Sequence, residues 1–156
     1  MKLYCVRHGE AMSGTDDQER CLSAKGEEDI TKIANYLSHH HVHVHHILVS
    51  DKRRAKQTAA IFQQALAVDQ VTATAVLSDP EGTVDELVEM ISSWHDDTML
   101  IGHMPFLSHL VSALVVGNDT NPLTIFPPGN VVCLEQTQGK HWIINWLLHP
   151  GLVSNL

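Results

Sequence analysis

Three short polar segments of this 156-residue chain carry histidine or arginine in positions that suggest chemistry. Arg7-His8-Gly9 follows the first apolar run, Arg54 lies in the basic segment that begins at Ser50, and Gly102-His103 precedes Met104-Pro105. A neutral imidazole nitrogen is a nucleophile, and a guanidinium group presents paired N–H donors that match phosphoryl oxygens. If the three segments meet in the folded protein, they form a site for phosphoryl transfer.

A short apolar run comes before each of these segments. Leu3–Val6, Ile47–Val49 and Thr98–Ile101 are too short for helices and have the composition of buried strands. In an open α/β sheet, ligands bind beyond the carboxyl ends of the strands. The sequence therefore predicts that the two histidines and the arginines meet in one crevice at that edge of the sheet.

Strand and helix patterns alternate along most of the chain. Apolar residues at helical spacing predict helices from the N-cap Ser23 to about Ser38, from Arg53 to about Ala67, over Thr83–Trp94 and over Phe106–Val115, and Val71–Leu77 has the composition of a further strand. This alternation predicts an α/β fold, a three-layer sandwich with a mostly parallel central sheet flanked by helices. Two β-rich runs, Val131–Gln136 and His141–Leu148, predict a closing β-hairpin at the C-terminus, on the sheet edge. We expect residues 1–156 to form a single domain.

The composition is typical of a globular domain without a broad basic surface. Hydrophobic residues make up 44% of the chain, and 18 acidic residues against 10 basic ones give a formal net charge of −8. This balance disfavours binding to nucleic acid or anionic lipid, so a phosphate site must be a local basic pocket. Cys5, Cys21 and Cys133 lack metal-ligand spacing, and no apolar stretch reaches the roughly 20 residues needed to span a bilayer. We expect a cytoplasmic monomer that binds neither membrane nor nucleic acid.

Together, the motifs resemble the histidine phosphatase superfamily, which has the phosphoglycerate mutase-like fold. They are Arg7-His8-Gly9 after the first strand, Ser50-Asp51-Lys52-Arg53-Arg54-Ala55-Lys56-Gln57-Thr58, and Gly102-His103-Met104-Pro105. Within the superfamily, the small size and the segment Arg20-Cys21-Leu22-Ser23-Ala24-Lys25-Gly26 resemble the SixA type of phosphohistidine phosphatase. The resemblance covers nearly the whole chain.

The resemblance implies a role for each pocket residue. His8 is the phosphate-accepting nucleophile, Arg7 and Arg54 clamp the phosphate, and His103 is a second histidine that binds the transferring group. Arg20 matches a further basic, substrate-binding position. The implied enzyme is a hydrolase without metal or cofactor. It removes phosphate from a histidine on a phosphorelay protein, such as a histidine-containing phosphotransfer domain, through a phospho-His8 intermediate.

The general acid of the larger relatives has no clear counterpart in this chain. Asp79 and Glu81 are the candidates, and neither lies in the pattern of that acid. An imidazole, with a pKa of about 6.5, leaves without the strong acid that an alcohol requires. The missing acid therefore favours phosphohistidine as substrate. The alternatives are a small-metabolite or phosphoester phosphatase that uses Asp79 or Glu81, and a non-catalytic phosphate-binding module, against which the retention of all four pocket residues argues.

The histidine-rich stretch 39–46 has two interpretations. Its six histidines could bind a transition metal such as zinc or nickel. However, the stretch lies between a predicted helix and a predicted strand and has no neighbouring cysteine. We favour a solvated connection that gains positive charge as pH falls through about 6 to 7.

Overall fold

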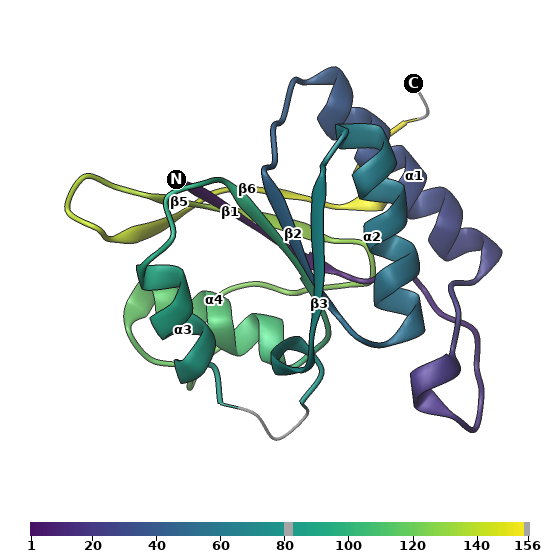
Figure 1. The fold of residues 1–156 in the computed structure, drawn as a ribbon, viewed down its shortest axis with the longest axis horizontal. Helices are drawn as coiled ribbons and strands as arrows, with labels where there is room; N and C mark the ends of the chain where they lie inside the picture. The colour runs from purple at the N-terminus through teal and green to yellow at the C-terminus, as the bar shows by residue number, and fades with distance from the viewer. Residues whose placement is uncertain (80–82, 155–156) are drawn as a thin grey trace.

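The structure is a computed structural model, and it describes residues 1–79 and 83–154. Within these residues, six strands form one sheet in the order β3-β2-β4-β1-β5-β6 (Figure 1). The parallel strands are β1 (Lys2–Arg7), β2 (His46–Ser50), β3 (Gln70–Thr74) and β4 (Thr98–Gly102), and the antiparallel strands are β5 (Val131–Gln136) and β6 (Trp142–Leu148). The predicted α/β fold, with a mostly parallel sheet and a closing hairpin at its edge, is confirmed.

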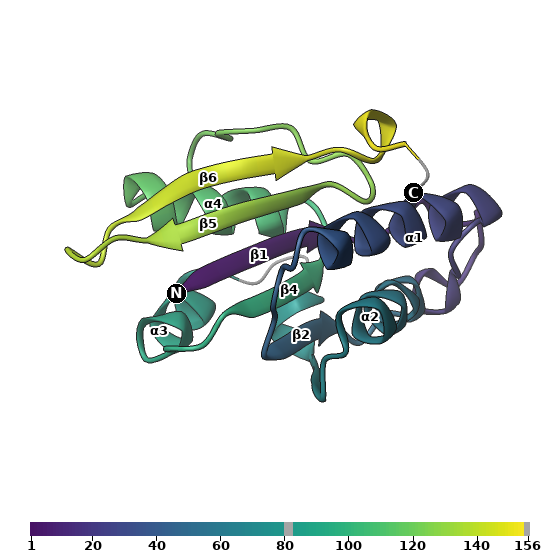
Figure 2. The same ribbon diagram turned by 90° about the horizontal axis from the view of Figure 1, so that it is seen from above.

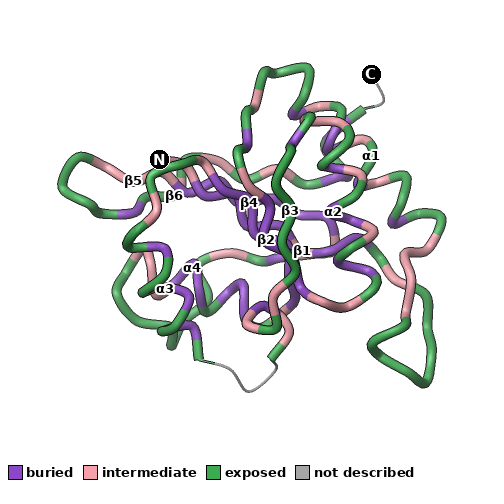
Figure 3. The backbone as a smooth tube through the Cα atoms, viewed as in Figure 1, coloured by how far each residue is buried: buried purple, intermediate pink, exposed green. Residues whose placement is uncertain are grey.

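Helices cover both faces of this sheet. The helices α1 (Ala24–His39) and α2 (Arg53–Leu66) lie on one side, and α3 (Asp85–Ser92) and α4 (Phe106–Val116) lie on the other. Alternate strand residues point to opposite faces, so Tyr4 and Val6 pack beneath α1 and α2, whereas Leu3 and Cys5 pack against α3 and α4. Figure 2 shows β6, β5, β1, β4 and β2 in order across the sheet. Figure 3 shows the central strands buried, whereas β3 at the edge is exposed. This arrangement is the predicted three-layer sandwich.

The first helix follows from its sequence pattern. The Ser23 side chain caps its N-terminus by accepting the Gly26 N–H at 3.0 Å, and the buried residues Ile30, Ile33 and Leu37 form its inner stripe.

Among the residues that the structure describes, no helix is both long enough and apolar enough to cross a membrane.

Two predicted elements are shorter than expected. The strand predicted over Val71–Leu77 ends at Thr74, whose side chain accepts the Val76 N–H and turns the chain into a 3₁₀ turn over Ala75–Leu77. The helix predicted over Thr83–Trp94 covers only Asp85–Ser92. Apolar content alone did not reveal these boundaries, because the buried residue Leu77 belongs to the turn rather than to the strand.

The segment after β1 crosses the first turn of α1 at very close range. A Cβ atom added to Gly26 would lie 2.1 Å from the backbone oxygen of Glu10, and one added to Gly9 would lie 2.9 Å from the backbone oxygen of Gly26. Only glycine at these positions lets the two backbones approach so closely. The packing of α1 therefore determines where the segment around His8 lies.

We predict that Gly26→Ala destabilises the protein despite the higher helix propensity of alanine. The added methyl group meets backbone atoms that cannot rotate away, so the free energy of unfolding falls by about 1–3 kcal/mol. Urea unfolding measures the change. Glu28→Ala, at an exposed position of the same helix, is the matched control. Equal stability of Gly26→Ala and the wild type would show that the two segments can separate freely.

Candidate active site

Three neighbouring strands deliver the predicted residues to one edge of the sheet. Strand β4 lies between β1 and β2, so the carboxyl ends that carry Arg7, His103 and Ser50 are adjacent. His8 and His103 follow directly, with ring centroids 4.9 Å apart. Arg54 Nε lies 3.3 Å from His8 Nε2. The structure thus brings together the four residues that the sequence placed in one crevice.

One face of α2 holds this arrangement in place. Arg54, Gln57 and Thr58 are three and four residues apart, so they share a face of the helix. Thr58 Oγ1 accepts the Gly9 N–H at 3.1 Å and donates to the Arg54 carbonyl at 2.8 Å, while Gln57 Oε1 accepts the Leu22 N–H at 2.8 Å. The helix that supplies the arginine therefore also anchors the backbone beside His8.

Hydrogen bonds determine which nitrogen of His8 is free to react. His8 Nδ1 lies 2.7 Å from the Gly9 carbonyl, which can only accept, so Nδ1 carries the proton. Its Nε2 accepts a hydrogen bond from Arg54 Nε and carries a lone pair. Burial lowers the pKa of His8 to about 4, with further lowering by the charges of Arg54, Arg7 and Arg20, against the opposing effect of the Gly9 hydrogen bond. His8 is thus a neutral imidazole, the form that a nucleophile requires.

His103 is also neutral in the unliganded protein. Burial lowers its pKa to about 3, and the coupling to His8 and the charges of Arg54 and Lys52 act in the same direction, against the opposing charge of Asp17. Its Nε2 lies 2.6 Å from Ser50 Oγ, and its Nδ1 is buried without a hydrogen-bond partner. One imidazole nitrogen of His103 is therefore satisfied by no protein group.

Arg7 presents a second unsatisfied atom. Its Nη1 donates to the Phe126 carbonyl at 2.8 Å, but its buried Nε has no partner. Burial and the nearby charge of Arg54 both lower the pKa of Arg7. A buried donor without an acceptor costs about 1–3 kcal/mol. An anion with several acceptor oxygens would satisfy this N–H and offset the repulsion between the two guanidinium groups, which points to a phosphoryl group.

Two further charged residues, Asp17 and Lys52, belong to the site, although the sequence predicted no role for either. Asp17, in the 3₁₀ turn Asp17–Glu19, accepts from Lys52 Nζ at 2.7 Å and lies 3.2 Å from Arg54 Nη2. Its backbone carbonyl accepts Arg54 Nη1 at 2.7 Å. The hydrogen bond from Lys52 holds the pKa of Asp17 well below its usual range. Asp17 and Lys52 are 35 residues apart, and no sequence pattern connects them.

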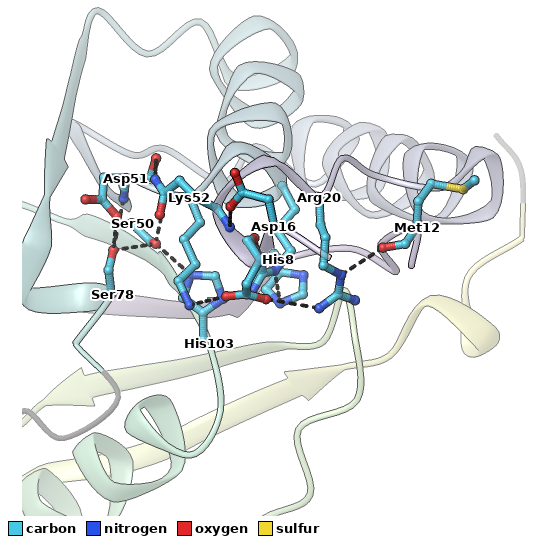
Figure 4. A network of polar contacts seen from close by, with 12 residues as sticks. His8, Met12, Asp16, Arg20, Ser50, Asp51, Lys52, Ser78 and His103 are labelled. Carbon is cyan, nitrogen blue, oxygen red and sulfur yellow. Dashed lines mark hydrogen bonds and ion pairs between the residues drawn. The ribbon is translucent and has the colours of Figure 1, made fainter. Parts of the chain in front are cut away.

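The remaining predicted site residues lie at the rim or outside the described residues. Arg20 donates from Nε to the Met12 carbonyl at 2.8 Å and pairs through Nη1 with Asp17 at 3.2 Å (Figure 4). Asp79 is exposed, two residues beyond the turn Ala75–Leu77. Glu81 lies outside the described residues. Arg20 is thus near the pocket.

The histidine-rich stretch runs from the last residue of α1 to the first residue of β2, so it lies at the opposite end of β2 from this pocket. His40, His41 and His43 line a cavity of about 560 Å³ together with Tyr4 and Trp146. Over residues 1–79 and 83–154, no three His, Cys, Asp or Glu side chains are grouped so that they could hold a metal ion. The geometry therefore gives no support to the metal-site interpretation of this stretch.

The two neutral histidines predict an acid-sensitive fold. An unfolded histidine has a pKa of about 6.5, whereas His8 and His103 take up protons only near pH 4 and pH 3. The native state binds fewer protons in this range, so its free energy of unfolding falls as pH falls from about 7 to 4. For His8 the loss is on the order of 3 kcal/mol. Urea unfolding across this range measures it. In His8→Gln the free energy of unfolding should depend less on pH than in the wild type, whereas the exposed control His39→Gln should keep the wild-type dependence. The same pH dependence in His8→Gln and the wild type would refute a buried, neutral His8.

Asp17 should compete with a bound anion for the cations of the site. Asp17→Asn removes the charge that occupies Lys52 and Arg54, so inorganic phosphate should bind about three- to tenfold more tightly. Isothermal titration calorimetry measures this affinity, and Asp16→Asn, next to it in the chain, is the matched control. Unchanged phosphate affinity in Asp17→Asn would mean that the Asp17 carboxylate and the bound phosphate do not compete for the same cations.

Comparison with known proteins agrees with this geometry. The sequence profile described as histidine phosphatase superfamily (branch 1) matches residues 3–79, which include His8 and Arg54. The chain is 24% identical over 155 residues to the phosphohistidine phosphatase SixA of Escherichia coli (strain K12), covering 96% of this chain and 94% of that protein.

Solved structures share the fold. The protein histidine phosphatase SixA complexed with tungstate has a TM-score of 0.86 at 23% identity, over 97% of this chain and 98% of that one. A mycobacterial glucosyl-3-phosphoglycerate phosphatase has a TM-score of 0.70 at 15% identity, over 92% of this chain and 96% of that one. With its paired strand-end histidines, its arginines and the profile match, the chain belongs to the histidine phosphatase superfamily.

Proposed function

We propose that this protein is a phosphohistidine phosphatase that dephosphorylates a histidine on another protein through a phospho-His8 intermediate. The observation that carries the proposal is the unprotonated Nε2 of a neutral His8, which accepts from Arg54 Nε beside the His103 ring. Arg7 Nε and His103 Nδ1, both buried, have no hydrogen-bond partner. A nucleophile and unpaired groups for phosphoryl oxygens therefore occupy the same pocket.

The reaction would proceed in two transfers. First, His8 Nε2 forms a bond to phosphorus while the bond from phosphorus to the substrate imidazole breaks. That imidazole carries a proton on its other ring nitrogen, so it keeps the electron pair and leaves as the neutral base. Second, a water oxygen bonds to phosphorus, the bond to Nε2 breaks, and its electron pair returns to His8. The water proton passes to solvent and inorganic phosphate leaves. Phosphoryl transfer depends mainly on positioning and charge, which Arg7, Arg54 and Lys52 supply, so we propose that no metal or cofactor takes part.

Phosphohistidine suits this pocket because its leaving group needs little help. The carboxylate that contacts the site's cations is Asp17, and its strongly lowered pKa keeps it ionised and unable to donate a proton. An imidazole leaves with less assistance than an alkoxide. The similarity to the Escherichia coli phosphohistidine phosphatase also supports the proposal. The partner we propose is a phosphorylated histidine-containing transfer domain.

We further propose that the chain acts as one domain and as a monomer in the cytoplasm. Its three cysteines are all free thiols, and such thiols persist in a reducing compartment.

A small phosphate ester is the second candidate substrate, and one placement favours it. Asp79 directly follows Ser78, which is hydrogen-bonded to the Ser50 that contacts His103. The Asp79 backbone therefore lies next to residues that contact the pocket. The fold is shared with a glucosyl-3-phosphoglycerate phosphatase, which acts on such an ester. Glu81, the other candidate acid, lies outside the described residues.

One experiment compares the two substrates directly. The protein is incubated without added metal with a phosphorylated histidine-containing transfer domain and, separately, with para-nitrophenyl phosphate. We expect faster loss of phosphohistidine, and we expect His8→Ala to lower both rates by at least about 10³-fold. Phosphoprotein electrophoresis and nitrophenolate absorbance follow the two reactions. His109→Ala, an exposed histidine on α4, is the control.

The contrary results separate the alternatives. Faster ester hydrolysis that Asp79→Asn abolishes would favour the small-ester phosphatase. Full activity in His8→Ala would contradict the nucleophile assignment for both substrates. Phosphate binding without turnover of either substrate would indicate a binding module.

A further inference from the structure

A chain of hydroxyl groups connects His103 to a carboxylate. His103 Nε2 lies 2.6 Å from Ser50 Oγ, and Ser50 Oγ lies 2.7 Å from Ser78 Oγ (Figure 4). Ser78 Oγ in turn donates to Asp51 Oδ1. Two backbone amides complete the network: Lys52 N–H donates to Ser50 Oγ at 3.3 Å, and Asp51 N–H donates to Ser78 Oγ at 3.1 Å.

The direction of every hydrogen bond in this chain follows from one fact. A carboxylate has no proton to give, so the single proton of Ser78 points to Asp51. Ser78 can then only accept from Ser50, and this uses the single proton of Ser50. The two lone pairs of Ser50 accept from the Lys52 amide and from His103. Each hydroxyl thereby uses one donor and two acceptor positions, with none left over.

His103 must therefore carry its proton on Nε2. In a neutral imidazole, the other nitrogen then has the lone pair, and that nitrogen is the buried, unpartnered Nδ1. His8 has the opposite arrangement, with the proton on Nδ1 and the lone pair on Nε2. Two adjacent histidines are thus held in opposite tautomers by different parts of the fold.

We propose that Asp51 and Ser78 are positioning residues that hold His103, through Ser50, in the Nε2–H form, so that Nδ1 meets a phosphoryl group as a proton acceptor. The inference rests on the proposed function only for the identity of the ligand. An acceptor nitrogen repels a fully ionised phosphoryl oxygen and accepts from a protonated one. A phosphoryl group loses its second proton near pH 6, so the protonated form is available near neutrality. The pocket therefore selects the monoanion, while Arg7 and Arg54 bind the remaining oxygens.

The tautomers can be measured in the free protein without any substrate. In ¹⁵N-histidine-labelled protein, long-range ¹H–¹⁵N correlation spectra distinguish a protonated ring nitrogen from an unprotonated one. We expect His103 to have an unprotonated Nδ1 and His8 to have an unprotonated Nε2. His103→Gln and His8→Gln assign the two signals. His8 serves as an internal reference, because its tautomer depends on Gly9 and not on the hydroxyl chain.

Ser78→Ala tests whether the chain causes the tautomer. Without Ser78, the Ser50 proton loses its acceptor and turns to His103 Nε2, so the His103 proton moves to Nδ1. We expect this change in the spectrum, a kcat/KM for phosphohistidine about tenfold lower, and phosphate binding that weakens less than in the wild type as pH rises from 5 to 8. Ser78→Thr keeps the hydroxyl at a half-buried position and should restore all three properties.

Ser92→Ala is the matched control, because it removes a serine hydroxyl that donates to the Glu89 carbonyl of its own helix. An Nδ1–H tautomer of His103 in the wild type would overturn the proposal, and so would an unchanged His103 spectrum in Ser78→Ala. Loss of activity without a tautomer change, or without rescue by Ser78→Thr, would show a merely structural role. If the tautomers are as expected and phosphohistidine is not hydrolysed, the proposed function fails and the positioning assignment stands.

Discussion

The site depends on keeping the imidazoles of His8 and His103 in the neutral form beside permanent positive charges. Burial supplies the larger part of the free energy that excludes the proton from His8 and His103, and the nearby cations add to it. The same cations attract the phosphoryl group. A single arrangement therefore repels a proton from the nucleophile and attracts the anion that the nucleophile attacks, and both effects require the pocket to be dry.

The fold creates this condition by its strand order. Because β4 is inserted between β1 and β2, residues about 50 and 100 positions apart in the chain meet at adjacent strand ends. The segment after β1 packs closely against α1 at Gly26, and the Gly9 N–H of the same segment donates a hydrogen bond to Thr58 of α2. The reactive side chains lie on backbone that two helices restrain, so little conformational entropy remains to be lost when a ligand binds.

Charge is arranged in layers around the pocket. The guanidinium groups of Arg7 and Arg54 are innermost, and Asp17 lies over Lys52 and Arg54 on an exposed turn. The Asp17 carboxylate offsets the charges of Lys52 and Arg54 when no ligand is bound. A chain with a net charge of −8 can therefore contain a basic pocket in which the repulsion between cations is reduced. The buried, unpaired Arg7 Nε and His103 Nδ1 are the part of this cost that remains.

The sequence by itself determined the layer architecture, the closing hairpin and the convergence of Arg7, His8, Arg54 and His103, because apolar periodicity and strand-end motifs are local signals. The end of β3 was misplaced, since Thr74 redirects the chain through a side-chain hydrogen bond that periodicity does not record. Only the tertiary structure revealed the roles of Asp17 and Lys52 and the proton positions on the two histidines. Those roles depend on which atoms form hydrogen bonds and in which direction, both between distant residues, as for Asp17 with Lys52 and His103 with Ser50, and between neighbours, as for His8 with Gly9. A linear pattern of residue types does not contain the positions of these atoms.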